Sequence, residues 1–162
     1  MSLRAVMRVL ATNAPGAVIA IRAAVGCVFL SEGVQKFLFS DALGAGRFAK
    51  IGIPWPHVMG SFVGGVEIVA GILVLVGLAT RVAALALTID MLVAITSTKL
   101  PILLGHGFFG FASPAADKTG FWVMMHEART DLAMILGAAF LLWVGAGAIS
   151  IDAAIARRTK GA

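Results

Sequence analysis

Residues 57–78 read HVMGSFVGGVEIVAGILVLVGL, an apolar segment with one carboxylate, Glu67, near its middle. A helix needs about 20 mainly apolar residues to cross a bilayer, and this segment is long enough. Three further apolar segments of similar length occupy about residues 17–39, 81–100 and 120–146. Backbone groups in lipid must find hydrogen-bond partners within the protein, which excludes open sheets. The sequence therefore predicts an all-α membrane protein, a bundle of four transmembrane helices with no strand.

The composition also indicates a membrane protein. Hydrophobic residues make up 60% of the chain and the mean hydropathy is +0.99, whereas soluble domains contain about 45–50% apolar residues. The net charge is +5, but the basic residues do not cluster on one face. We therefore expect membrane lipids, and no nucleic acid, as partners. No repeat or low-complexity linker divides residues 1–162, which predicts a single domain.

Lysine and arginine residues outside the spans indicate the orientation. They are in excess on both terminal tails and at Arg81 in the second connection. The positive-inside rule then places both termini in the cytoplasm and a glycine-rich loop at residues 102–120 outside. A cleaved signal peptide is disfavoured because Pro15 and Arg22 interrupt the first apolar run. Residues 2–12 are instead predicted to form a short interfacial helix.

Every predicted span contains ionisable residues, and a charge at bilayer depth costs about 2.5–3.5 kcal/mol on insertion scales. Such residues must pair with one another, face a watery cavity or carry a function. Helical spacing aligns Gly60, Gly64, Glu67 and Gly71 on one stripe, and each other span has a comparable small or polar face. We expect these faces to point inward together. The charged residues within the spans are Arg22, Glu32, Lys36, Glu67, Asp90, Lys99, Glu127, Arg129 and Asp131.

A rise of about 1.5 Å per residue places Glu67 and Asp90 near the midplane and Arg22 toward the cytoplasmic side. We predict that Arg22 pairs with Glu67 or Asp90, because an unpaired buried cation is costly. Glu32 precedes Lys36 at a spacing that favours an ion pair. The outer charges and the two midplane carboxylates are predicted to form one polar cluster beside an apolar cleft, a candidate ligand or proton site: Glu32, Lys36, Glu67, Asp90, Lys99, Glu127, Arg129 and Asp131. The alternative is a set of buried salt bridges that fix helix order, and the two roles can coexist.

The chain has no self-contained catalytic motif, so whether it is an enzyme stays open. Cys27 is its only cysteine, which excludes an intrachain disulfide and a Cys-x-x-Cys motif. No glycine-rich nucleotide loop follows a strand, and a flavin or nicotinamide reaction would need a partner chain. His57, His106 and His126 lack a metal-binding spacing, and no metal site is predicted. An apolar cleft with a few polar groups would suit a quinone.

Residues 22–37, RAAVGCVFLSEGVQKF, resemble the first helix of the DoxX family of small membrane proteins, in which an arginine precedes a glycine, a Phe-Leu pair and Gly-x-x-Lys-Phe. Further resemblances follow in order along the chain: Phe48 with GIP at 52–54, Glu67 with Gly71, GLATR at 77–81, Lys99, Glu127, and GAGAISID at 145–152. The resemblance implies a four-helix protein of the bacterial inner membrane. It also implies a link to quinone-coupled sulfur oxidation or to complexes that handle oxidative and thiol stress.

We therefore predict an integral membrane subunit of a quinone-linked or oxidative-stress redox complex, with redox enzyme chains as its partners. The alternatives are a non-catalytic anchor or assembly subunit and, with less support, a carrier of lipids or small solutes. A ligand-sized space near Glu67 would favour the first function. A solid interior with every charge paired would favour the anchor. The oligomeric state is not predicted.

Overall fold

The computed structural model describes Thr12 and residues 14–160, without the side chain of Lys160, and every regular element among them is a helix. Apart from Thr12, the predicted interfacial helix at residues 2–12 lies outside the described residues. The long helices are α2 (Val18–Leu38), α5 (Pro56–Val76), α6 (Thr80–Ala94) and α8 (Phe121–Val144). The shorter elements are α3 (Ser40–Leu43), α4 (Ala45–Ile51), the π-turn η1 (Ile95–Lys99), α7 (Leu100–Leu104) and α9 (Ile151–Lys160).

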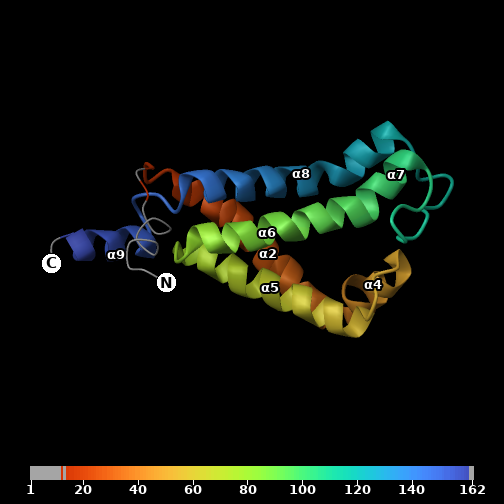
Figure 1. Cartoon of the computed structure of the whole chain (residues 1–162), viewed down its shortest axis with the longest axis horizontal. Helices are drawn as coiled ribbons and strands as arrows, with labels where there is room; N and C mark the ends of the chain where they lie inside the picture. The colour runs from red at the N-terminus through yellow and green to blue at the C-terminus, as the bar shows by residue number, and fades with distance from the viewer. Residues whose placement is uncertain (1–11, 13, 161–162) are drawn as a thin grey trace.

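Three helical segments are long and apolar enough to cross a membrane: α2, α5 and the continuous run Thr80–Leu104 formed by α6, η1 and α7. α8 is 24 residues long and lies alongside α6 in the same bundle (Figure 1). Its first half carries Glu127, Arg129 and Asp131, and it falls outside the three apolar segments. The described residues therefore form an all-helical membrane protein with three candidate spans, and a fourth span in α8 stays a prediction.

The long helices form two pairs, in which α2 packs on α5 and α8 packs on α6. The pairs meet along α5 and α6, and they diverge toward α4 and α7 (Figure 1). We call the divergent end the cavity end; it includes α3, α4 and the loop at residues 105–120. We call the opposite end the closed end; it holds the turn at residues 77–79 and the segment at residues 145–150.

Glycines allow the close approach of α2 and α5. A Cβ atom on Gly33 would lie 2.7 Å from the carbonyl oxygen of Gly64, and one on Gly26 would lie 2.9 Å from that of Gly71. Larger residues at these positions would push the two helices apart. The small-residue stripe expected on the second span thus packs against α2, and it brings Glu67, on the same stripe, toward that helix.

The apolar core fills the space between the pairs toward the closed end. Phe29, Leu87 and Leu141 are almost completely buried there and come from α2, α6 and α8. Val74 on α5 completes the contact between all four helices. Because the core occupies this end, the space that remains between the pairs lies toward the cavity end.

The third apolar segment ends later than the sequence predicts. The predicted segment ends at residue 100, just before Pro101, but the helix continues to Leu104. Pro101 lies in the first turn of α7, where its fixed backbone angle and missing N–H are tolerated. The π-turn before it allows the Leu100 N–H to bond the Ile95 carbonyl five residues back. The loop that follows therefore begins at residue 105 and not at residue 102.

Candidate functional site

A cavity of about 690 Å³ lies between the two helix pairs at the cavity end. Its walls come from α2 and α5 on one side and from α6, η1 and α8 on the other. Apolar residues cover it, among them Phe48 and Ile51 from α4, Trp55 from the following connection and Phe111 from the loop. The Ala112 N–H donates to the Ile51 carbonyl at 3.0 Å, which joins the loop to α4 above the cavity.

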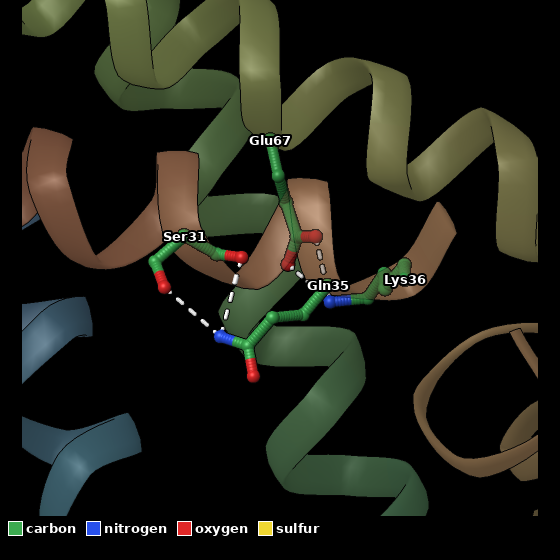
Figure 2. A network of polar contacts seen from close by, with 4 residues as sticks. All are labelled: Ser31, Gln35, Lys36 and Glu67. Carbon is green, nitrogen blue, oxygen red and sulfur yellow. Dashed lines mark hydrogen bonds and ion pairs between the residues drawn. The ribbon is translucent and has the colours of Figure 1, made fainter. Parts of the chain in front are cut away.

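An ion pair between Lys36 and Glu67 forms part of the cavity wall about midway along α5. The Lys36 Nζ lies 2.8 Å from Oε1 and 2.6 Å from Oε2 of Glu67. Figure 2 shows Lys36 on α2 turned toward Glu67 on α5, with Gln35 donating to Ser31 one turn earlier on α2. Glu67 is 2% exposed, so its charge depends on this partner. Glu32, the partner that helical spacing suggests for Lys36, is exposed instead.

Asp90 on α6 brings a second carboxyl group beside this pair and interacts with both Lys36 and Glu67. Its Oδ2 atom is buried and has no hydrogen-bond partner within the described part of the chain. One ammonium group therefore faces two carboxyl groups. The unpaired oxygen is enclosed by protein atoms, next to the carboxyl group of Glu67.

A second ion pair lies on the opposite wall. The Lys99 Nζ lies 3.4 Å from Oδ2 of Asp131, which joins the π-turn to α8. Lys99 is buried although it carries a charge, because the π-turn directs it between the helices. Each ion pair thus connects elements within one helix pair: α2 with α5, and η1 with α8.

All residues of the predicted cluster except Arg129 line the cavity. Arg129 is exposed and its guanidinium donates to the His126 carbonyl on its own helix. The physical reason is helical phase: Glu127 and Asp131 are four residues apart on one face, and Arg129 lies between them on the opposite face. The cavity residues from the predicted cluster are Glu32, Lys36, Glu67, Asp90, Lys99, Glu127 and Asp131.

The structure adds Arg47, which lies in sequence between the first two predicted spans and outside the predicted cluster. It lies on α4, a short helix over the cavity in a segment predicted only as a connection. The neighbouring Phe48 is one of the residues that carry the family resemblance, and it was the sequence feature that could have drawn attention to this segment. Within the cavity lining, five acidic residues therefore outnumber three basic residues: Glu32, Glu67, Asp90, Glu127 and Asp131 against Lys36, Arg47 and Lys99.

The prediction that Arg22 pairs with Glu67 or Asp90 is wrong. Its guanidinium lies at the closed end and donates to backbone carbonyls: Nε to Val74 at 2.8 Å, and the terminal nitrogens to Leu75 at 2.6 Å, Ala146 at 3.1 Å and Ile149 at 2.5 Å. The last carbonyls of α5 lack helical partners and carry the negative end of the helix dipole. They provide the acceptors that a buried arginine needs.

Asp152 completes this arrangement and was not singled out as a site residue from the sequence. Its carboxylate accepts from the N–H groups of Ala79 at 2.7 Å and Thr80 at 3.0 Å, where α6 begins. Arg81 donates to the carbonyls of Leu142 and Trp143, where α8 ends. The GLATR and GAGAISID segments, noted separately in the sequence, are thus bound to each other.

Comparison with known proteins agrees with this picture of a membrane protein. A membrane protein of Mycobacterium tuberculosis (strain ATCC 25618 / H37Rv), described as uncharacterized, is 52% identical over 151 residues, covering 93% of this chain and 88% of that protein. No solved structure matches the chain. The DoxX family model matches residues 17–107, more than half of the chain, from α2 through α7. The match includes the glycine-lined contact of α2 with α5 and the Lys36–Glu67 pair, and the chain belongs to the DoxX family.

Proposed function

We propose that this chain is an integral membrane subunit of a quinone-linked or oxidative-stress redox complex, and that its cavity holds the head group of a quinone-like ligand. The observation that carries the proposal is the cavity of about 690 Å³ beside the Lys36–Glu67 pair. Sites for small molecules commonly enclose about 300–1,000 Å³, with mostly apolar walls and a few polar groups. The size and lining of this cavity agree with that description.

The polar groups suit the chemistry of such a head group. Lys36 offers N–H donors to a carbonyl oxygen, while Glu67 and Asp90 offer acceptors and can hold or pass a proton. All three lie where α2, α5 and α6 come together, and mainly apolar surface lines the cavity around them. The free volume beside the Lys36–Glu67 pair favours a ligand-binding subunit over an anchor with a solid interior.

The proposal includes four spans, with α8 as the fourth, and both termini in the cytoplasm of a bacterium. Two features of α8 support its spanning the membrane: Glu127 and Asp131 face the cavity instead of lipid, and Arg129 points back along its own helix toward the nearer end. Thr12 bonds the Val144 carbonyl, so the described start of the chain lies at the same end as the end of α8. This arrangement fits an even number of crossings. Reporter fusions after residue 112 and after residue 162 should report opposite sides of the membrane.

The test of function is affinity purification from native membranes, with identification of both the lipids and the protein chains that remain bound. We expect a quinone and redox enzyme chains to copurify with the wild-type protein. Lys36→Met combined with Glu67→Gln should leave a folded protein that loses the quinone. Arg129→Gln is the matched control, because Arg129 is exposed and outside the cavity lining. A wild-type protein that retains no quinone and binds none when it is added would contradict the proposal.

A further inference from the structure

Lys99 brings a second buried ammonium group to the cavity, on the wall opposite Lys36. Its side chain is 10% exposed and belongs to the cavity lining. It is the last residue of the π-turn η1, which interrupts the regular helix at this point. Such turns are uncommon inside helices and are often found at functional sites. A charged residue placed in this way needs an explanation beyond its ion pair.

The ammonium group of Lys99 has donors to spare. Its partner within the described residues is Asp131, with Nζ 3.4 Å from Oδ2, whereas N–H···O hydrogen bonds usually measure about 2.7–3.2 Å. A lysine carries three N–H donors, and this long contact occupies at most one of them. The nearby hydroxyl groups of Ser97 and Thr98 donate to the Ala94 carbonyl of their own helix. Among the buried side chains of this wall, Lys99 is therefore the donor that can serve a ligand.

The two lysines lie at different heights along the cavity. Lys36 contacts Glu67 and interacts with Asp90 on α6, nine residues before Lys99. A rise of about 1.5 Å per residue separates the backbones of Asp90 and Lys99 by about 13 Å. Side chains on a helix lean toward its N-terminal end, so the ammonium group of Lys99 reaches back toward Asp90. The space between the two ammonium groups therefore suits one ring that has an oxygen at each end.

We propose that Lys99 is the second contact of the head group: the ligand carries hydrogen-bond acceptors at opposite ends of one ring, and Lys36 bonds one of them while Lys99 bonds the other. The inference rests on the proposed function, since it places the ring of a quinone-like ligand in the cavity. Lys36 contacts both oxygens of Glu67, and its three N–H groups leave one for the ligand.

This placement makes the ligand a connection between the two helix pairs. Lys36 belongs to the pair of α2 and α5, whereas Lys99 is bound to α8 in the other pair. The pairs diverge at the cavity end (Figure 1), and no ion pair among the described residues joins one pair to the other there. A ligand with a single acceptor could bond one pair only. The cavity should therefore select head groups with two opposite acceptors.

The test compares a two-acceptor ligand with a one-acceptor counterpart on the full-length chain in lipid nanodiscs. Decyl-1,4-benzoquinone has two carbonyl groups and a decyl-cyclohexenone has one, and protein-free nanodiscs correct for partitioning into lipid. We expect the quinone to bind about tenfold more tightly, equivalent to about 1.4 kcal/mol, in keeping with one more hydrogen bond to a charged group. Lys99→Met should remove this preference and leave binding of the cyclohexenone nearly unchanged. Lys118→Met, in the loop and outside the cavity lining, is the matched control and should retain the preference.

A second measurement needs no variant and covers a Lys99→Met protein that does not fold. The quinone is labelled isotopically at one carbonyl carbon or at the other, and the infrared stretching band of each carbonyl is recorded in the wild-type chain and in lipid. A hydrogen bond from a charged donor lowers this frequency. We therefore expect both carbonyl bands of the bound quinone to lie below their positions in lipid.

The possible outcomes separate the inference from the proposed function. Equal binding of the two compounds by the wild-type chain, or a carbonyl band that keeps its position in lipid, would overturn the inference while the proposed function stands. In a folded Lys99→Met protein, an unchanged preference for the quinone would overturn it as well. An equal loss of both compounds in that variant would show that Lys99 only supports the fold. Binding of neither compound by the wild-type chain would contradict the proposed function itself.

Discussion

The two ends of the bundle use buried charges in different ways. At the closed end, Arg22, Arg81 and Asp152 bond the backbone at the ends of α5, α8 and α6. At the cavity end, Lys36 and Lys99 bond side chains, the carboxylates of Glu67 and Asp131. A backbone partner cannot be removed by substitution, but a side-chain partner can. The closed end is therefore fixed in its geometry, whereas the cavity end can exchange its charges in pairs.

The closed end also matches the polarity of each helix end. The two arginines lie at the C-terminal ends of α5 and α8, where unpaired carbonyls carry partial negative charge. Asp152 lies at the N-terminal end of α6, where unpaired N–H groups carry partial positive charge. Each charge thus bonds backbone groups at the end of a helix.

The largest expected effect is at Arg22. Arg22→Met removes four hydrogen bonds to carbonyls, and we expect the free energy of unfolding to fall by about 3–5 kcal/mol, the range for removing one partner of a buried charged interaction. Arg22→Lys should recover little, because a lysine cannot reach acceptors in several directions at once. Unfolding in mixed micelles measures the loss. Rescue of Arg22→Met by Glu67→Gln would show that Arg22 depends on a carboxylate, contrary to the structure.

The next effect tests the exchangeable pair. Lys36→Met should lower the free energy of unfolding by about 3 kcal/mol, because it leaves the carboxylate of Glu67 buried without its partner. Adding Glu67→Gln should recover much of this loss, so the two substitutions should be strongly non-additive in a double-mutant cycle. Additive losses would mean that the cavity end is as fixed as the closed end.

Gly77 tests the packing of the closed end without changing a charge. Its φ of +70° favours glycine, and a Cβ atom would lie 2.7 Å from Cζ of Arg22. Gly77→Ala should therefore lower the free energy of unfolding by about 1–3 kcal/mol. Gly65→Ala is the matched control, since a Cβ atom there meets nothing within 4 Å and alanine favours the helix. A comparable loss at both positions would show that the closed end is no more tightly packed than the surroundings of Gly65.

The smallest effect is expected at the second cavity pair. Asp131 is 20% exposed at its side chain and lies 3.4 Å from Lys99. Asp131→Asn should lower the free energy of unfolding by only about 0.5–1 kcal/mol, as for other partly exposed ion pairs. Asp117→Asn in the loop should have no measurable effect and serves as the control. A loss as large as that of Lys36→Met would show that the two ion pairs stabilise the fold to the same extent.

The sequence predicts which side chains line the cavity better than it predicts which groups bond Arg22 at the closed end. The reason is physical. Helical periodicity follows from residue type, so the inward faces of α2 and α5 are readable from their glycines and from Glu67. The same periodicity separates Arg129 from Glu127 and Asp131, and a stricter use of helical phase would have excluded it from the cluster. The carbonyls that bind Arg22 carry no such signature, because every residue has one.

Helix ends were also hard to predict. Pro101 usually marks the end of a helix, yet the π-turn before it changes the backbone pairing and lets the helix continue to Leu104. The sequence pattern of polar residues followed by a proline is the same whether the helix ends there or continues through a π-turn. The short helix α4 presents a similar difficulty, since seven residues are too few for periodicity to stand out. Arg47, on this helix, is therefore absent from the predicted cluster.

The bonds of Arg22 also set an order of events during synthesis. Its first partners, Val74 and Leu75, follow it by 52 and 53 residues, but Ala146 and Ile149 follow by 124 and 127. Until residues 146–149 have been synthesised, two of the four hydrogen bonds of the Arg22 guanidinium cannot form. Lys36 meets Glu67 after a separation of only 31 residues. A nascent chain released before residue 146 would therefore keep the Lys36–Glu67 pair. At its closed end, Arg22 would lack the acceptors of Ala146 and Ile149. We expect membrane quality control to recognise such a product by its incompletely bonded arginine.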